Sequence, residues 1–130
     1  MFIIEAGCKK KSAIGLSIIA LIFYTLPVMA DTSSEFYRLK KKDILAHIIG
    51  KVVTDETHWS DYYRKDGTVL TLSMGTEETG KWLIKNDELC IISKSANECY
   101  TVWQSGNQVE LRLAGTDYPY AGVIKDYKEH

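Results

Sequence analysis

The chain has 130 residues, of which 45% are hydrophobic and 25% charged, and its formal net charge at pH 7 is −1. This mild negative charge argues against a nucleic-acid partner, because binding to phosphate requires a basic face. The single basic cluster of residues 31–130, "RLKKKD", is interpreted as the solvated face of a short helix.

Residues 1–30 have the pattern of a secretory signal peptide. Three consecutive lysines precede the apolar run "AIGLSIIALIFYTL", and "PVMA" places Val28 and Ala30 at the −3 and −1 positions of a cleavage site. The run is shorter than the roughly 20 residues of a spanning helix, so we expect no stable membrane anchor after cleavage, an uncleaved anchor being the alternative. The expected product is a single exported β-domain, residues 31–130, periplasmic or secreted. Removal of residues 1–30 takes away three lysines and one glutamate. The formal net charge therefore changes from −1 for the full chain to −3 for the domain.

Two cysteines, Cys90 and Cys99, remain in residues 31–130. Export implies a compartment in which disulfides persist. Zinc sites usually show C-x2-C or H-x3-H spacing and redox pairs C-x-x-C, and neither spacing occurs here. We therefore predict a structural disulfide between Cys90 and Cys99, and neither a metal nor a cofactor is expected.

One short helix is expected near the start of the domain. Asp43 is a suitable N-cap residue and Gly50 a suitable stop. Between them, four apolar residues at helical spacing form one face: Ile44, Leu45, Ile48 and Ile49. We expect this helix to pack on, or to plug, the structure that follows.

After Gly50 the hydrophobic pattern changes to period 2, with a turn signal about every ten residues. Asp66-Gly67 and Gly106-Asn107 are turn dipeptides, and "GTEET" is expected to separate two strands. The expected strands are "HWSDYYR", "TVLTLSM", "GKWLIK", "LCIIS", "CYTVW", "QVELRL" and "YAGVIKDY". The predicted fold is mainly β, an antiparallel meander of about seven strands that forms a curled sheet or small barrel, with one short N-terminal helix.

Aromatic residues are numerous for so small a domain, and some of them are expected to form a binding surface. Tyr62 and Tyr63 are consecutive, so they face opposite sides of a strand and one of them is expected to be exposed. Tyr118 and Tyr120 flank a proline near a turn. With Trp103, these four tyrosines make up the candidate surface for a protein or a small ligand. Burial in the core is the alternative for each of them.

The densest group of ionisable residues surrounds His58, with Asp55, Glu56 and Asp61 nearby in sequence. A general acid–base site is conceivable there, and a polar loop entering a strand is the alternative. The sequence contains no G-x-S-x-G motif and no glycine-rich phosphate loop. No catalytic residue is therefore assigned, and the sequence favours a non-enzymatic protein.

Short motifs in the domain resemble those of known families. "GKW" and "TDYPY" resemble the G-x-W and T-D-Y motifs of lipocalins, although "GKW" falls in mid-domain here and opens the first strand in lipocalins. The set "DILAHIIGKVV", "YYRKDGT", "GKW", "LC" and "CYTVW" covers most of the domain. It resembles a family of small exported proteins of Gram-negative bacteria, mainly alphaproteobacteria, which share a D-G turn, a G-x-W strand and an L-C…C-aromatic hairpin.

This second resemblance implies a periplasmic or secreted β-domain and no reaction. It places in the family pattern eight residues that form turns, strand entries, core or the bridge: Asp66, Gly67, Gly80, Trp82, Leu89, Cys90, Cys99 and Tyr100.

The sequence is compatible with three functions. The first is a non-enzymatic binding module that engages an envelope or extracellular protein, for example as an inhibitor of a hydrolase. The second is a lipocalin-like carrier with a small-ligand pocket lined by Trp103, Tyr100 or Trp59. The third is a small hydrolytic enzyme that uses His58, Asp61 and Glu56.

Overall fold

The computed structural model describes residue 24 and residues 35–129, so the expected leader, residues 1–30, lies outside the described residues apart from Tyr24. All described helices and strands belong to one compact unit, Thr32–His130. Within the described part of the chain, no helix has the length and apolar character needed to cross a membrane.

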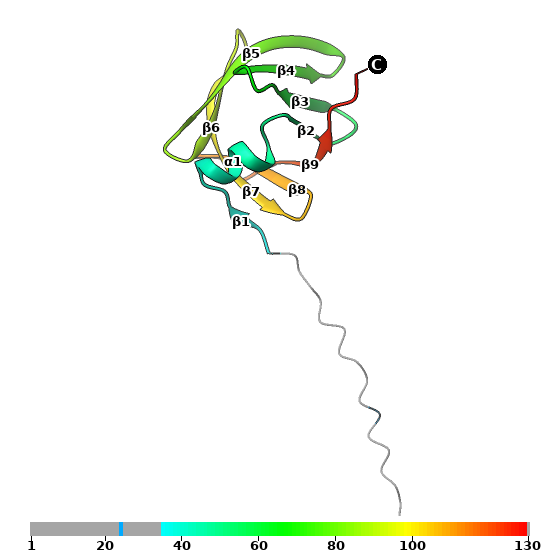
Figure 1. Ribbon diagram of the computed structural model, residues 1–130, viewed down its shortest axis with the longest axis vertical. Coiled ribbons are helices and arrows are strands. Elements are labelled where there is room, and N and C mark those ends of the chain that lie inside the picture. Colours follow the sequence, from blue (N-terminus) through cyan, green and yellow to red (C-terminus); the bar gives the residue numbers. More distant parts are fainter. Residues whose placement is uncertain (1–23, 25–34, 130) are drawn as a thin grey trace, which may run out of the picture. The chain divides into compact units, whose positions relative to one another are not determined.

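Residues 35–129 form one helix and nine strands, which are labelled in Figure 1. In chain order these are β1 (Tyr37–Arg38), α1 (Lys41–His47), β2 (Lys51–Thr54), β3 (Trp59–Tyr63), β4 (Thr68–Ser73), β5 (Thr76–Lys85), β6 (Glu88–Ile92), β7 (Asn97–Ser105), β8 (Gln108–Leu113) and β9 (Tyr120–Asp126).

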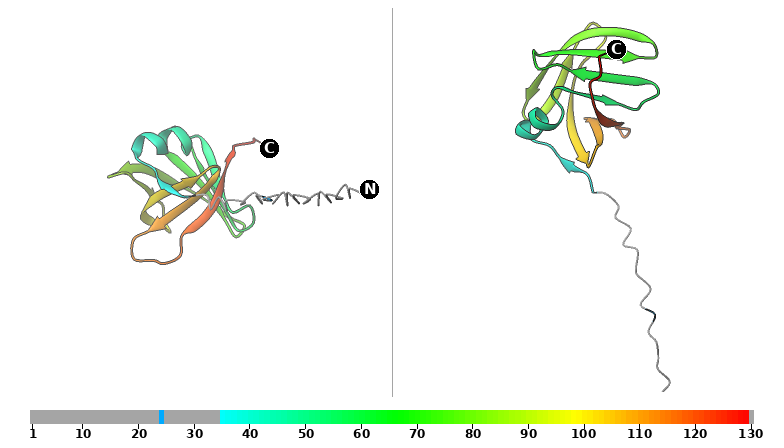
Figure 2. Two further views of the ribbon diagram at one scale, coloured as in Figure 1. Left: turned by 90° about the horizontal axis from the view of Figure 1, so that it is seen from below. Right: turned by 45° about the vertical axis from the view of Figure 1, so that its right-hand side comes forward.

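Strands β2 to β9 form a closed eight-stranded antiparallel barrel, in which each strand pairs with its neighbours in sequence. The pairing of β2 with β9 closes the barrel, and the strands follow one another around it (Figure 2). β1 is an additional short strand that pairs with the end of β7. The predicted fold class is therefore confirmed.

Two details of the prediction need correction. The seven expected strands are present, but β1 and β2 are additional, because each is too short to show a clear period of two. "GTEET" is not a separator: β5 begins at Thr76, and the loop before it is only Met74-Gly75. Both of these loop residues have positive φ, 49° and 83°, as a tight hairpin turn of the primed type requires.

The predicted disulfide is present. Cys90 and Cys99 lie directly opposite each other on β6 and β7, and their sulfur atoms are 2.02 Å apart. A cross-link over so short a loop stabilises the fold by about 2.5 kcal/mol in the chain-entropy model.

Helix α1 lies against the end of the barrel formed by the β3–β4, β5–β6 and β7–β8 turns. The Lys41 backbone N–H donates to Asp87 Oδ1 in the β5–β6 turn at 2.8 Å. The His47 ring and the Gln104 side chain at the end of β7 share a 2.7 Å hydrogen bond. Ile44 and Ile48 of the helix face are fully buried. The expectation that the helix packs on or plugs the barrel is therefore met.

Two positions of the helix differ from expectation. The N-cap residue is Lys40 and not Asp43, which lies inside the first turn. Leu45 was assigned to the buried face but is 44% exposed, because it points away from the barrel while Ile44 and Ile48 point into it.

This arrangement predicts different costs for two similar truncations of the helix. Ile48→Ala removes a fully buried side chain and is expected to lower the free energy of unfolding by about 2–4 kcal/mol. Leu45→Ala is expected to change it by only about 0.5 kcal/mol, because nearly half of that residue is already in contact with water. Urea unfolding of both variants provides the measurement, and equal losses would contradict the placement of the helix.

Candidate functional site

The barrel interior differs between its two ends. At the end covered by α1, the inward-facing side chains are closely packed and almost without exposure: Val53, Tyr63, Val69, Leu89, Val102 and Val109. At the opposite end, a cavity of about 140 Å³ opens between the strands. It is lined by Trp59, Asp61, Thr71, Ser73, Ile91, Tyr100, Leu111 and Tyr120, and is called the mouth cavity below.

Asp61 is the acidic side chain of the mouth cavity. It lies on β3, whose alternation turns Trp59, Asp61 and Tyr63 inward, and it is only 8% exposed. Its Oδ1 accepts a hydrogen bond from the Thr71 hydroxyl at 2.7 Å, and its Oδ2 accepts one from the Tyr63 hydroxyl at 3.2 Å. Two neutral hydroxyl groups therefore hold the carboxyl group in place.

Burial raises the pKa of Asp61, and the hydrogen bonds from Thr71 and Tyr63 oppose this only in part. Burial and the nearby Asp61 charge raise the pKa of Tyr63 well above its usual range. Burial and the hydrogen bond to Glu98 also raise the pKa of Tyr100, so both phenols stay protonated at neutral pH. The interior thus gives a negative charge on Asp61 little stabilisation.

Three aromatic rings enclose the cavity above Asp61. The Tyr120 ring meets Trp59 with centroids 6.2 Å apart and planes at 83°, and it meets Tyr100 at 5.9 Å and 82°. Such edge-to-face contacts stabilise aromatic pairs beyond the area that they bury. Gly122 on β9 makes room for this arrangement, because a Cβ there would lie 2.8 Å from the Thr54 carbonyl oxygen and 3.2 Å from the Trp59 ring.

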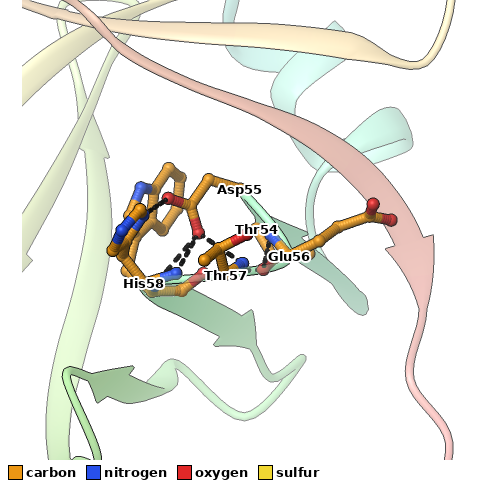
Figure 3. A network of polar contacts seen from close by, with 6 residues as sticks. Thr54, Asp55, Glu56, Thr57 and His58 are labelled. Carbon is orange, nitrogen blue, oxygen red and sulfur yellow. Dashed lines mark hydrogen bonds and ion pairs between the residues drawn. The ribbon is translucent and has the colours of Figure 1, made fainter.

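The loop between β2 and β3 borders the same end of the barrel and is shaped by Asp55 (Figure 3). Asp55 Oδ1 accepts from the backbone N–H groups of Thr57, His58 and Trp59 at 2.9, 2.7 and 3.0 Å. Its Oδ2 lies 2.8 Å from His58 Nδ1. Desolvation acts to raise the pKa of Asp55, but these hydrogen bonds together lower it well below the usual range. Asp55 therefore orders the loop that leads into Trp59.

The residues of the predicted acid–base group do not converge on one point. His58 is exposed beside Asp55, and the Glu56 carboxylate is paired with Lys125 of β9. Asp61 points into the barrel. Across residues 35–129, no three histidine, cysteine, aspartate or glutamate side chains are grouped so that they could hold a metal ion.

The five residues of the predicted binding surface lie in different places. Tyr63 was a candidate for exposure but is fully buried, because it is the inward-facing member of the Tyr62-Tyr63 pair. Trp103 lies on the outer face of β7, beneath the Arg112 guanidinium at 4.1 Å from its ring centroid. Tyr118 is 87% exposed in the β8–β9 loop, and Tyr120 lines the mouth cavity. Of the pocket residues expected for a carrier, Trp59 and Tyr100 line the cavity and Trp103 does not.

Tyr62 lies in a second depression, on the outside of the barrel, called the outer groove. Its ring stacks on Tyr127 with centroids 3.9 Å apart and planes at 1°. The groove measures about 670 Å³ and is lined by Val52, Ser60, Tyr62, Leu70, Leu72, Glu77 and residues 125–128. It is a broad outer surface, whereas the mouth cavity is an opening into the interior.

Sequence reasoning placed Asp61 in the wrong group. It was associated with His58 by proximity in sequence, whereas the structure brings it together with Thr71 of β4 and Tyr100 of β7. The available signal was the alternation in "WSDYY", which puts an aspartate on the same inward-facing side as Trp59 and Tyr63. An acidic residue at an inward-facing position of a strand is uncommon, which makes it a candidate for a functional site.

Comparisons with known proteins add no family assignment. A scan against protein-family models, a search of curated proteins and a search of solved structures each found no match to this chain. Function is therefore argued from the geometry of the site.

The position of Asp61 leads to a prediction for stability. Because its pKa is raised in the folded state, its contribution to stability is fully present below the unfolded-state pKa and is lost as pH rises through the folded-state value. Asp61→Asn, which does not titrate, is therefore expected to gain stability relative to the unmodified protein between pH 4 and pH 7. Thermal or urea unfolding at both pH values measures the difference.

Asp117→Asn, the same change of charge in the exposed β8–β9 loop, is the control. A free-energy difference between Asp61→Asn and the unmodified protein that stays equal at both pH values would contradict the buried placement of this carboxyl group.

Proposed function

We propose that this chain is an exported, non-enzymatic β-barrel that binds a small molecule in its mouth cavity. The observation that carries the proposal is the cavity itself, with the buried carboxyl group of Asp61 at its base and the aromatic rings of Trp59, Tyr100 and Tyr120 around it. A concave, mostly apolar site with a few convergent polar groups, here Asp61, Thr71 and Ser73, is the usual form of a small-molecule site.

The size of the cavity supports a small ligand. An apolar cavity of roughly 150 Å³ accommodates a molecule such as benzene, and the mouth cavity measures about 140 Å³. An eight-stranded barrel has an interior that is either filled by side chains or holds one small ligand. Here, side chains and α1 fill one end of the interior. The mouth cavity leaves room for a small ligand at the other end.

The disulfide and the sequence of residues 1–30 support the export part of the proposal. Disulfides persist in the periplasm and outside the cell, and the Cys90–Cys99 bridge joins two adjacent strands. The leader pattern is consistent with the same compartment. A periplasmic or secreted location is proposed on the same grounds. Membership of the small exported bacterial β-domain family is proposed from the motifs that resemble it, and the absence of a nucleic-acid partner from the negative net charge.

Docking of an envelope or extracellular protein is the second candidate function, and the outer groove favours it. Tyr62, Leu70 and Leu72 place apolar area on the outside of the barrel, and Leu72 is 46% exposed. Aromatic and aliphatic side chains rimmed by charged ones, here Glu77 and Lys125, suit a protein interface.

Two adjacent positions on β4 distinguish the two functions. Ser73 lines the mouth cavity and Leu72 lines the outer groove. Ser73→Trp should fill the cavity and abolish small-molecule binding, whereas Leu72→Trp should leave that binding unchanged. Saturation-transfer NMR of the disulfide-bonded protein with a mixture of small amine and aromatic fragments provides the measurement.

The opposite pattern, in which Leu72→Trp alone removes binding, would show that the fragments bind in the outer groove and not in the mouth cavity. A fragment mixture that gives no signal with the unmodified protein would contradict small-molecule binding at the barrel mouth.

A further inference from the structure

We propose that the mouth cavity binds a small organic cation of the methylated ammonium class. This inference rests on the proposed function, because it names the ligand class of the same cavity. Two features of the cavity carry it together: a buried carboxyl group that has no cationic partner, and an aromatic lining.

The charge balance of the cavity is the first argument. Among the side chains that line it, Asp61 is acidic and there is no lysine, arginine or histidine. The hydrogen-bond donors to Asp61, Thr71 and Tyr63, are both neutral. In the part of the chain that the structure describes, Asp61 takes part in no ion pair. Buried carboxylates are normally paired with a cation, so the charge that this cavity lacks is positive.

The aromatic lining narrows the kind of cation. Rings attract a cation through their quadrupole, and quaternary ammonium groups are commonly recognised by enclosures of this type. A primary ammonium is strongly hydrated and needs several hydrogen-bond acceptors, whereas Trp59, Tyr100 and Tyr120 mainly offer ring surface. A methylated ammonium, which is weakly hydrated, matches a cavity with three rings and one carboxylate.

A second carboxylate strengthens the negative potential at this end of the barrel. Glu98 lies on β7, two residues before Tyr100, and accepts a hydrogen bond from the Tyr100 hydroxyl. This contact fixes the Tyr100 ring as a wall of the cavity. A metal ion fits less well than an organic cation, since no metal-binding group of side chains occurs in residues 35–129.

The test compares choline with 3,3-dimethyl-1-butanol, its uncharged isostere of nearly the same shape. Titration of the disulfide-bonded protein, followed by NMR shifts of Trp59 and Tyr120, is expected to give choline at least roughly ten-fold tighter binding than the alcohol. Asp61→Asn should remove most of this preference and leave the affinity for the alcohol within about two-fold. Asp117→Asn, an equal change of charge in an exposed loop, should leave the preference intact.

Each result has a defined meaning. Equal binding of choline and the alcohol by the unmodified protein, or an Asp61→Asn variant that keeps the preference, overturns the cation inference but leaves small-molecule binding standing. Failure of choline to bind, while fragments sensitive to Ser73→Trp do bind, has the same meaning. If neither choline nor any such fragment binds, the proposed function fails as well.

A second experiment distinguishes two sources of a methylated ammonium group, a lipid headgroup and a free cation. Co-sedimentation with phosphatidylcholine vesicles, together with choline binding, would assign the lipid headgroup as the ligand. Choline binding without co-sedimentation would assign a free cation.

Discussion

The pairing of β2 with β9 is the interaction on which the rest of this structure depends. Four residue pairs, from Lys51↔Asp126 to Thr54↔Val123, join strands near the two ends of the domain. Without them the meander would be an open sheet with two unpaired edges, which are liable to aggregate. With them, alternate residues of eight strands face a common interior. The core and the mouth cavity are both consequences of that closure.

The interior is used in two ways. At one end, α1 and the inward-facing aliphatic residues form a packed core. At the other end, Asp61 occupies a position where an apolar side chain would pack with less desolvation cost. Natural proteins retain such locally unfavourable residues mainly where function requires them. The polar hydroxyls of Thr71 and Tyr63 hold the carboxyl group without neutralising it, so a cationic ligand would complete the arrangement.

Local patterns in the sequence were sufficient to predict much of this fold. Period-2 alternation and turn dipeptides identified seven strands, and the spacing of Cys90 and Cys99 in adjacent strands identified the disulfide. Strand β2 was missed because four residues after a helix carry little periodic signal. The site was predicted only in part, since Trp59 and Tyr100 were named as pocket residues but Asp61 was grouped with His58. The side chains of the mouth cavity come together only through pairing between strands that are distant in sequence. No local sequence pattern encodes that pairing.

The pKa of Asp61 in the folded protein is the measurement to make first, because it reports both the burial of this carboxyl group and its contact with a cation. It can be followed by the ¹³C resonance of the carboxyl carbon, first in the free protein and then with saturating tetramethylammonium. We expect a pKa above the ordinary aspartate value in the free protein, because the carboxyl group is buried, and a clear decrease when the cation is bound. An ordinary pKa in the free protein, or a raised value that the cation leaves unchanged, would contradict it.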